Sequence, residues 1–246
     1  MEIELVNYFI KGNIALTKVD EDCPDNKLSG AVFEVYSDTN GDGKLDNDDT
    51  LLGEMKELDG GVYQMSELRY GKYLVKETKA PTGFVLDEDV YAVSIEENGK
   101  TYTVENKAGV GFINAAQKGS LKIVKTSSDG KVEGFSFRVT GVDYDHTFKT
   151  DKNGEIVIEG LRIGDYTVSE VSDKASAGYI LPADKQVTVK VNATAIVQMH
   201  NEFRDTPKTG DDFNLGLWVS LAALSVVGAG VLGFVGYKNR KKKKED

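Results

Sequence analysis

Hydrophobic and polar residues alternate along most of this chain, in short runs separated by turn residues. The segments 14–16 and 121–123 each place an apolar side chain at every second position. That spacing is typical of a strand with one buried face. Asn-Gly pairs at 98–99 and 153–154 separate such runs, and this dipeptide favours turns. No long helical period occurs before residue 204, so the pattern predicts an all-β fold.

The alternating pattern occurs twice. The matched segments are 12–18 with 119–125, 30–35 with 134–139, and 83–86 with 178–181. Self-similarity of this kind indicates tandem domains, which we expect over residues 12–117 and 118–204. Each has the usual size of a domain, and several short strands with regular turns predict a β-sandwich. The segment between residues 30 and 61 of the first domain is eleven residues longer than the matching segment 134–154 of the second, because of an insertion.

Residues 1–11 resemble the end of a further repeat. Asn7 stands five residues before Gly12, as Asn114 stands five before Gly119, and each glycine follows a lysine. The first residues also lack the basic start and apolar stretch of a secretory signal peptide. We therefore expect residues 1–11 to be the last strand of a preceding repeat, in a longer protein whose export signal lies upstream.

An uncharged apolar run at 215–237 precedes a basic tail at 238–244. The run is long enough to span a bilayer as a single helix, and the tail would remain on the cytoplasmic side, leaving the upstream residues outside. By themselves these features predict a tail anchor. Shortly before the run stand Thr206, Pro207, Lys208, Thr209 and Gly210.

Pentapeptide, span and tail together make segment 205–246 resemble the cell-wall sorting signal of Gram-positive surface proteins. In that family a membrane sortase cuts after the threonine, here Thr209, and joins its carboxyl group to peptidoglycan or to a pilin subunit. Thr206 stands where the family most often has leucine, which leaves the sortase class open. The resemblance implies a membrane-spanning precursor that becomes anchored to the cell wall, at the Gram-positive cell surface.

Charge agrees with a protein outside the cell. The net charge is −10 although the tail is basic, so residues 1–237 carry −14. This balance keeps a surface protein soluble and argues against nucleic acid as a partner. Cys23 is the one cysteine and cannot form an internal disulfide, so stability must come from elsewhere.

Three polar residues of each repeat share a strand face with apolar residues. In the first repeat Lys18 follows Ile14 and Leu16, Glu77 follows Tyr73 and Val75, and Asn114 follows Val110 and Phe112. The second repeat places Lys125, Glu170 and Asn201 in the same way. Buried ions are costly unless paired. A buried Lys–Glu salt bridge with a bonded asparagine, or strand ends that reach solvent, would explain the pattern.

A covalent interpretation is also available. Burial lowers the pKa of a lysine and raises that of a carboxyl group. A neutral amine can then attack an asparagine amide, with the glutamate as proton carrier, and release ammonia to leave an isopeptide bond. Asn106 competes with Asn114 as acceptor, because Tyr102 and Val104 share its face; the matching offsets of Asn7 and Asn201 favour Asn114.

Both repeats resemble CnaB-type domains, the B repeats of collagen-binding surface proteins and of SpaA-type pilins. The motifs are Lys18-Val19-Asp20, the run YLVKETKAPTGF at 73–84, Phe112-Ile113-Asn114, and in the second repeat Lys125, YTVSE at 166–170, AGY at 177–179 and Asn201. The resemblance implies two tandem reverse-immunoglobulin-like sandwiches, followed by the single transmembrane helix. It also implies the bonds Lys18–Asn114, catalysed by Glu77, and Lys125–Asn201, catalysed by Glu170. Such chemistry happens once, so we expect no enzyme.

The insertion of the first repeat reads DTNGDGKLDNDD at 38–49. Its spacing is similar to an EF-hand-type loop, with a glycine at its sixth position. The expected Ca²⁺ ligands are the side chains of Asp38, Asn40, Asp42, Asp46 and Asp49 and the carbonyl of Lys44. The flanks do not read as helices, so the ion would be structural. The alternative is a solvated acidic loop.

These features favour a structural surface protein: a sortase-anchored stalk, or a minor or basal pilin subunit, built from self-crosslinked domains. A Tyr-Pro-Lys motif of the kind used in pilus polymerisation is not found in the sequence. One alternative is an adhesin that binds a host or matrix ligand. Another is the spacer and anchor of a larger surface enzyme whose catalytic domain lies upstream.

Overall fold

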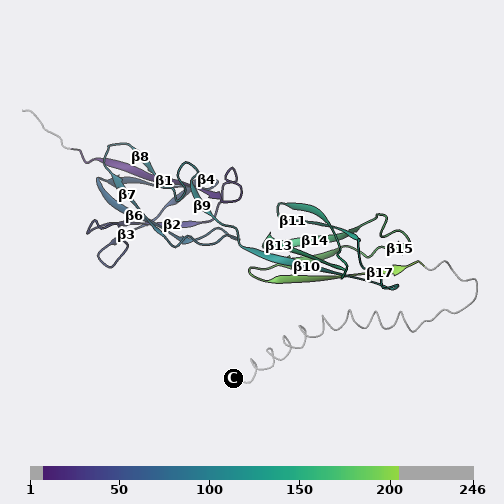
Figure 1. The fold of residues 1–246 in the computed structure, drawn as a ribbon. Coiled ribbons are helices and arrows are strands. Elements are labelled where there is room, and N and C mark those ends of the chain that lie inside the picture. Colours follow the sequence, from purple (N-terminus) through teal and green to yellow (C-terminus); the bar gives the residue numbers. More distant parts are fainter. Residues whose placement is uncertain (1–7, 205–246) are drawn as a thin grey trace, which may run out of the picture. The chain divides into compact units, whose positions relative to one another are not determined.

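The computed structural model describes residues 8–204, which form seventeen strands and no helix (Figure 1). The expected all-β class is therefore confirmed for this range. No helix in the described range is long and apolar enough to cross a membrane. The sorting motif 206–210, the expected spanning segment 215–237 and the basic tail 238–244 lie outside the described residues, as do residues 1–7.

The first domain consists of two sheets. One has the order β4-β5-β1-β8, with β9 also paired to β1, and the other has the order β3-β2-β6-β7. Their bounds are β1 Lys11–Asp20, β2 Val32–Ser37, β3 Thr50–Glu54, β4 Lys56–Asp59, β5 Val62–Arg69, β6 Gly71–Lys79, β7 Val90–Ile95, β8 Thr101–Thr103 and β9 Phe112–Asn114.

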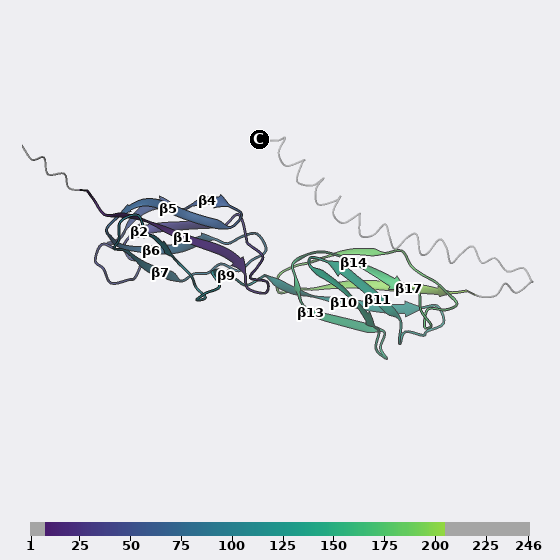
Figure 2. The ribbon, with the colours of Figure 1, turned by 90° about the horizontal axis from the view of Figure 1, so that it is seen from above.

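The second domain likewise consists of two sheets, with the orders β13-β10-β17-β15 and β12-β11-β14-β16. Figure 2 shows this domain in teal to green. Its strands are β10 Lys118–Ser127, β11 Ser136–Gly141, β12 Tyr144–Lys149, β13 Glu155–Arg162, β14 Gly164–Val171, β15 Tyr179–Ile180, β16 Lys185–Val189 and β17 Thr194–Phe203. The two sequence repeats therefore correspond to two domains that share the central strand order of their sheets and differ at the edge strands β4 and β15.

The first and last strands of each domain are neighbours and run parallel. In the first domain β8 also runs parallel to β1, whereas the other strand pairs are antiparallel. Lys18 lies opposite Phe112 in β9, and Lys125 lies opposite Met199 in β17. In both domains the asparagine comes two residues after that partner. Because side chains two apart share a face of the sheet, this register directs the lysine and the asparagine into the same core.

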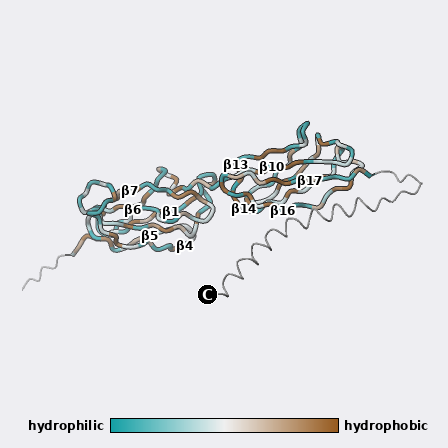
Figure 3. The backbone as a smooth tube through the Cα atoms, turned by 90° about the horizontal axis from the view of Figure 1, so that it is seen from below, coloured by the Kyte–Doolittle hydropathy of each residue, from teal (hydrophilic) through white to brown (hydrophobic). Residues whose placement is uncertain are grey.

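Alternation along each strand separates the core from the surface. Along β1 every second residue is buried, from Gly12 to Lys18. The core between the sheets of the first domain contains Ile14, Leu16, Phe33, Val35, Tyr63, Val75 and Phe112, and that of the second contains Leu121, Ile123, Phe137, Val139, Tyr166, Val168 and Met199. Apolar segments follow the strands and polar segments the loops between them (Figure 3).

The last strand differs between the domains. In the second domain β17 is continuous over ten residues. In the first, the chain leaves the sheet after Thr103 and returns only at Phe112. Val110 therefore lies in a turn, and the expectation that it belongs to the strand of Asn114 was wrong. The return passes Gly111, where a Cβ atom would come within 2.8 Å of the Thr17 carbonyl oxygen, so the close backbone approach requires glycine.

Candidate functional site

In the first domain β1, β6 and β9 bring Lys18, Glu77 and Asn114 together, and none of the three is more than 3% exposed. Lys18 Nζ lies 3.5 Å from Glu77 Oε1. The Asn114 amide nitrogen is 3.0 and 2.9 Å from the two carboxylate oxygens and donates to them. Lys18 Nζ also donates to the Phe112 carbonyl at 3.3 Å. The glutamate therefore contacts both groups between which a bond is expected.

The second domain holds Lys125, Glu170 and Asn201 on β10, β14 and β17, again buried. Asn201 donates its side-chain N–H to Glu170 Oε1 at 2.6 Å. Lys125 Nζ donates instead to the backbone carbonyl of Thr126 and lies 4.2 Å from the ring centre of Phe135. The Glu–Asn contact is thus common to both domains, whereas the lysine contacts differ.

A glycine turn holds the backbone of each lysine. The Lys18 N–H donates to Gly61 O, and the Lys125 N–H to Gly154 O, both at 2.7 Å. Both glycines have positive φ, +80° and +78°. A Cβ atom would come within 3.0 Å of the Lys18 carbonyl at Gly61 and within 2.7 Å of the Lys125 carbonyl at Gly154. These turns explain why the repeats share a glycine here, and they fix where each lysine enters the core.

Burial changes the proton affinity of these groups. Desolvation lowers the pKa of Lys18 to about 8, against the opposing attraction of Glu77 and Asp87. Burial also lowers the pKa of Lys125, although Glu170 and Asp129 oppose it. The pKa of Glu170 is raised by burial, against the hydrogen bond from Asn201 and the charge of Lys125. Both lysines are therefore shifted toward the neutral, nucleophilic amine, and Glu170 toward the protonated acid.

The acceptor oxygens of both asparagines are buried without a hydrogen-bond partner, as is Glu170 Oε2. Leaving a buried acceptor unpaired costs about 1–3 kcal/mol. The amide oxygen is also the atom on which negative charge develops when a nucleophile attacks the amide carbon. The site thus keeps this oxygen available for a proton donor such as a neutral glutamic acid.

Asn106 does not join the first triad. Its side chain bonds Asp87 and the backbone of Ile113, while Asn114 contacts Glu77. Of the two candidate acceptors, the structure places Asn114 beside the glutamate. Sequence reasoning missed Asp87 and Tyr91, which surround this site. The second repeat has no matching residues, so the comparison of repeats contained no signal for them.

The sequence matches the family of SpaA prealbumin-like fold domains over residues 12–108 and 119–203. The chain belongs to this family. Its two SpaA domains correspond to the two sandwiches described above, each with its buried lysine, glutamate and asparagine. A comparison with curated protein sequences found no match.

Solved structures resemble this SpaA-family chain to different degrees. The Bacillus anthracis TIE protein is 26% identical with a TM-score of 0.58, and the alignment covers 79% of this chain and 34% of that one. The chain thus spans about a third of the TIE protein. The minor pilin GBS52 of Streptococcus agalactiae is 16% identical, with a TM-score of 0.36 and coverage of 82% and 100%. The shaft pilin SpaA of Lactobacillus rhamnosus GG is 14% identical, with a TM-score of 0.35 and coverage of 80% and 99%.

The acidic insertion of the first SpaA domain joins β2 to β3 as a tightly bonded loop. Asp38 is largely buried and accepts the N–H groups of Gly41 and Gly43. The Asn40 amide nitrogen lies 3.2 Å from Asp46 Oδ2. The other expected ligand side chains, Asp42 and Asp49, also accept amides of the loop, among them the Lys44 N–H. Within residues 8–204 no group of three or more acidic, histidine or cysteine side chains is arranged to hold a metal ion.

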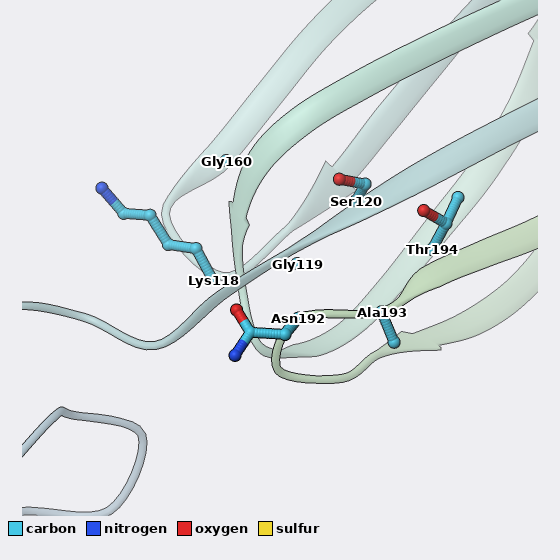
Figure 4. A pocket seen from close by; sticks show the side chains of 7 residues that line it. All are labelled: Lys118, Gly119, Ser120, Gly160, Asn192, Ala193 and Thr194. Carbon is cyan, nitrogen blue, oxygen red and sulfur yellow. The ribbon is translucent and has the colours of Figure 1, made fainter.

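A cavity of about 340 Å³ in the second SpaA domain opens at the end of β10 remote from Lys125 (Figure 4). Lys118 is its one charged lining residue, and the ammonium group binds Asp22 rather than facing the cavity. The remaining lining is Gly119, Ser120, Gly160, Asn192, Ala193 and Thr194. This lining offers no acid–base pair.

We expect the free amine of Lys18 to make stability depend on pH. Asn114→Ala removes the acceptor and leaves the amine unreacted. Because burial lowers the folded-state pKa to about 8 from an ordinary value of 10.5, the unfolded chain binds more protons between these values. Stability should therefore rise with pH across this window and be lowest below it. Calorimetric melting of the full chain from pH 7 to 10.5 measures this.

The matched control is the double variant Lys18→Met, Asn114→Ala, which has no titrating amine at this position. Its melting temperature should change less over the same window. Equal pH profiles for the two variants would show that Lys18 is not held at a lowered pKa.

Proposed function

We propose that this chain is a structural surface protein, a wall-anchored stalk or a minor or basal pilin subunit, whose two domains are each closed by a Lys–Asn isopeptide bond. One observation supports this most strongly. The same buried lysine, glutamate and asparagine recur between the parallel first and last strands of both domains, with the glutamate bonded to the asparagine amide. A buried lysine–glutamate ion pair by itself would not require an asparagine beside the glutamate in both domains.

The proposed reaction conserves every atom and needs no oxidant. The neutral Nζ of Lys18 attacks the side-chain carbonyl carbon of Asn114, so that a C–N bond forms. Glu77 accepts a proton from Nζ and delivers one to the amide nitrogen, which it already contacts. The C–NH₂ bond then breaks, ammonia leaves, and the glutamate returns to its initial protonation state. Lys125, Asn201 and Glu170 take the same roles, and each site reacts once.

The bond suits a protein under tension. It joins two strands that are adjacent in space but lie at opposite ends of the domain sequence. Pulling on the two ends therefore loads the covalent bond instead of separating the first strand from the last. By analogy with a disulfide that closes a loop of similar length, each bond should stabilise its domain by about 4 to 5 kcal/mol. This replaces the disulfides that a chain with one cysteine cannot form.

The decisive measurement is the intact mass of the full recombinant chain. Each bond releases one ammonia, so two bonds should lower the mass by about 34 Da relative to the sequence. Glu77→Ala should halve the deficit to about 17 Da, with the remaining crosslink at Lys125 and Asn201 in a peptide digest. Glu88→Ala, which changes an exposed glutamate, is the control and should keep the full deficit. A wild-type chain at its calculated mass would refute the bonds.

We extend the proposal to the C-terminal segment outside the described residues. The motif 206–210, the apolar run and the basic tail support a sortase as processing partner, with the membrane as temporary anchor. Cleavage after Thr209 would transfer the chain to peptidoglycan or to another pilin subunit, and hence to the Gram-positive cell surface.

Sortase processing can be tested in a Gram-positive host, with the full chain placed behind an export signal. The wild type should appear in the fraction released by peptidoglycan digestion. Thr209→Ala should instead stay with the membrane, because its cleavage site is lost. Lys208→Ala, at the variable position of the motif, should be processed normally. Equal distribution of all three proteins would contradict the sorting signal.

We also propose that the loop 38–49 binds a structural Ca²⁺. Its support is the ligand spacing together with the crowding of the acidic side chains of Asp38, Asp42, Asp46 and Asp49. The loop amides now bonded to these side chains occupy only part of their oxygen capacity. A cation would offset the repulsion between the carboxylates and reduce the freedom of the insertion.

Calorimetric titration of the full chain with CaCl₂ should detect one site, and Ca²⁺ should raise the melting temperature of the first domain. Asp46→Ala should weaken binding by about tenfold or more, since it removes a charged ligand. Asp48→Ala removes the same charge from a position outside the ligand set and should have a smaller effect. Equal losses in both variants would indicate only a diffuse acidic loop.

A further inference from the structure

The asparagine of the first domain lies on a much shorter strand than that of the second. Asn201 is inside β17, which pairs with β10 over eight residues. Asn114 ends β9, which pairs with β1 over three. Residues 104–111, which precede β9, form no strand. A ladder this short constrains Asn114 less than the long ladder constrains Asn201, so another contact must fix its position.

Asn106 supplies such a contact. Its side-chain oxygen accepts the Ile113 N–H at 2.6 Å, and its amide nitrogen donates to the Ile113 carbonyl at 2.8 Å. These two bonds reproduce what a neighbouring strand would offer to the residue just before Asn114. The same nitrogen donates to Asp87 Oδ2 at 2.7 Å. The Asn106 amide thus holds β9 from the side and connects it to a second residue.

Asp87 links this support to the catalytic glutamate. Its backbone N–H donates to Glu77 Oε2 at 2.9 Å. Its carboxylate accepts from Asn106 and, at 2.8 Å, from the Tyr91 hydroxyl of β7. A continuous set of hydrogen bonds therefore runs from Glu77 through Asp87 and Asn106 to the strand of Asn114. One network therefore holds both Glu77 and the strand that carries Asn114.

The second domain lacks this network. Aligned from Gly83 and Gly178, the position of Asp87 is occupied by Pro182, and proline has no backbone N–H to donate. Glu170 Oε2 accordingly has no hydrogen-bond partner. There the long pairing of β17 with β10 holds the strand that carries Asn201.

We propose that Asn106 and Asp87 are positioning residues for bond formation in the first domain, and that they replace the strand ladder that performs this task in the second. The inference rests on the proposed isopeptide chemistry. Neither residue exchanges a proton or forms a bond; they hold the Asn114 amide against Glu77. Misplacement of reacting groups by about 1 Å can cost about a hundredfold in rate.

The test follows bond formation in time. The full chain is made by cell-free synthesis, samples are quenched in acid, and peptide mapping by mass spectrometry reports the Lys18–Asn114 and Lys125–Asn201 bonds separately. Asn106→Ala should slow the first bond by about tenfold or more and leave the second, an internal control, unchanged. Glu105→Ala is the matched control, because it removes a hydrogen bond to Gly109 within the same loop without touching Ile113.

Variants of Asp87 distinguish a positioning role of this residue from a purely electrostatic effect on Lys18. Its charge raises the pKa of Lys18, so removing that charge alone would leave more neutral amine and speed the reaction. Positioning predicts the opposite for Asp87→Ala, a slower first bond. Asp87→Asn keeps a side-chain oxygen that can accept from Asn106 and Tyr91, and should restore most of the rate. In Asn106→Ala the rate of formation of the first bond should fall at every pH, and the inflection of its pH–rate profile should stay at the wild-type pH.

Formation of the first bond at the wild-type rate in both Asn106→Ala and Asp87→Ala would overturn the inference while leaving the isopeptide proposal intact. So would a faster reaction in Asp87→Ala. Absence of both bonds from the wild type would instead refute the proposed function itself. If Asn106→Ala fails to fold, the comparison of Asp87→Ala with Asp87→Asn still decides.

Discussion

Each domain buries a lysine amine in the same core as a glutamate. Lys18 and Lys125 are at most 1% exposed, and placing an ion in such surroundings costs several kcal/mol. Three features of the fold lower that cost: burial shifts the amine toward its neutral form, the glutamate lies in the same core, and glycine turns fix the lysine backbone. Under the proposed chemistry the cost is removed permanently, because a neutral amide replaces the amine.

The parallel pairing of the first and last strands determines which residues the buried lysine can reach. It brings residues far apart in sequence within one core, with the asparagine two residues beyond the partner of the lysine in both domains. A bond at this place closes almost the whole domain into one loop. The same residues on antiparallel neighbours joined by a hairpin would close a short loop and constrain the unfolded chain less.

The two domains hold the same three residue types, lysine, glutamate and asparagine, through different contacts. The second uses a continuous last strand, and its lysine bonds the backbone of Thr126. The first has an interrupted last strand, and a network of side chains through Asp87 and Asn106 holds its acid and amide. The two repeats thus share the buried lysine, glutamate and asparagine, while the contacts that position these residues differ.

The sequence by itself determined the all-β class, the two domains, and the faces on which Lys18, Glu77 and Asn114 lie, because strand periodicity and repeat spacing are local properties. The repeat offsets favoured Asn114 over Asn106, but only the tertiary structure showed that Asn114 contacts Glu77, because this contact depends on the register of β9 against β1. It also removed Val110 from that strand and brought Asp87 to Glu77. Local periodicity decides which way a side chain points, whereas pairing across nearly a hundred residues decides what it meets.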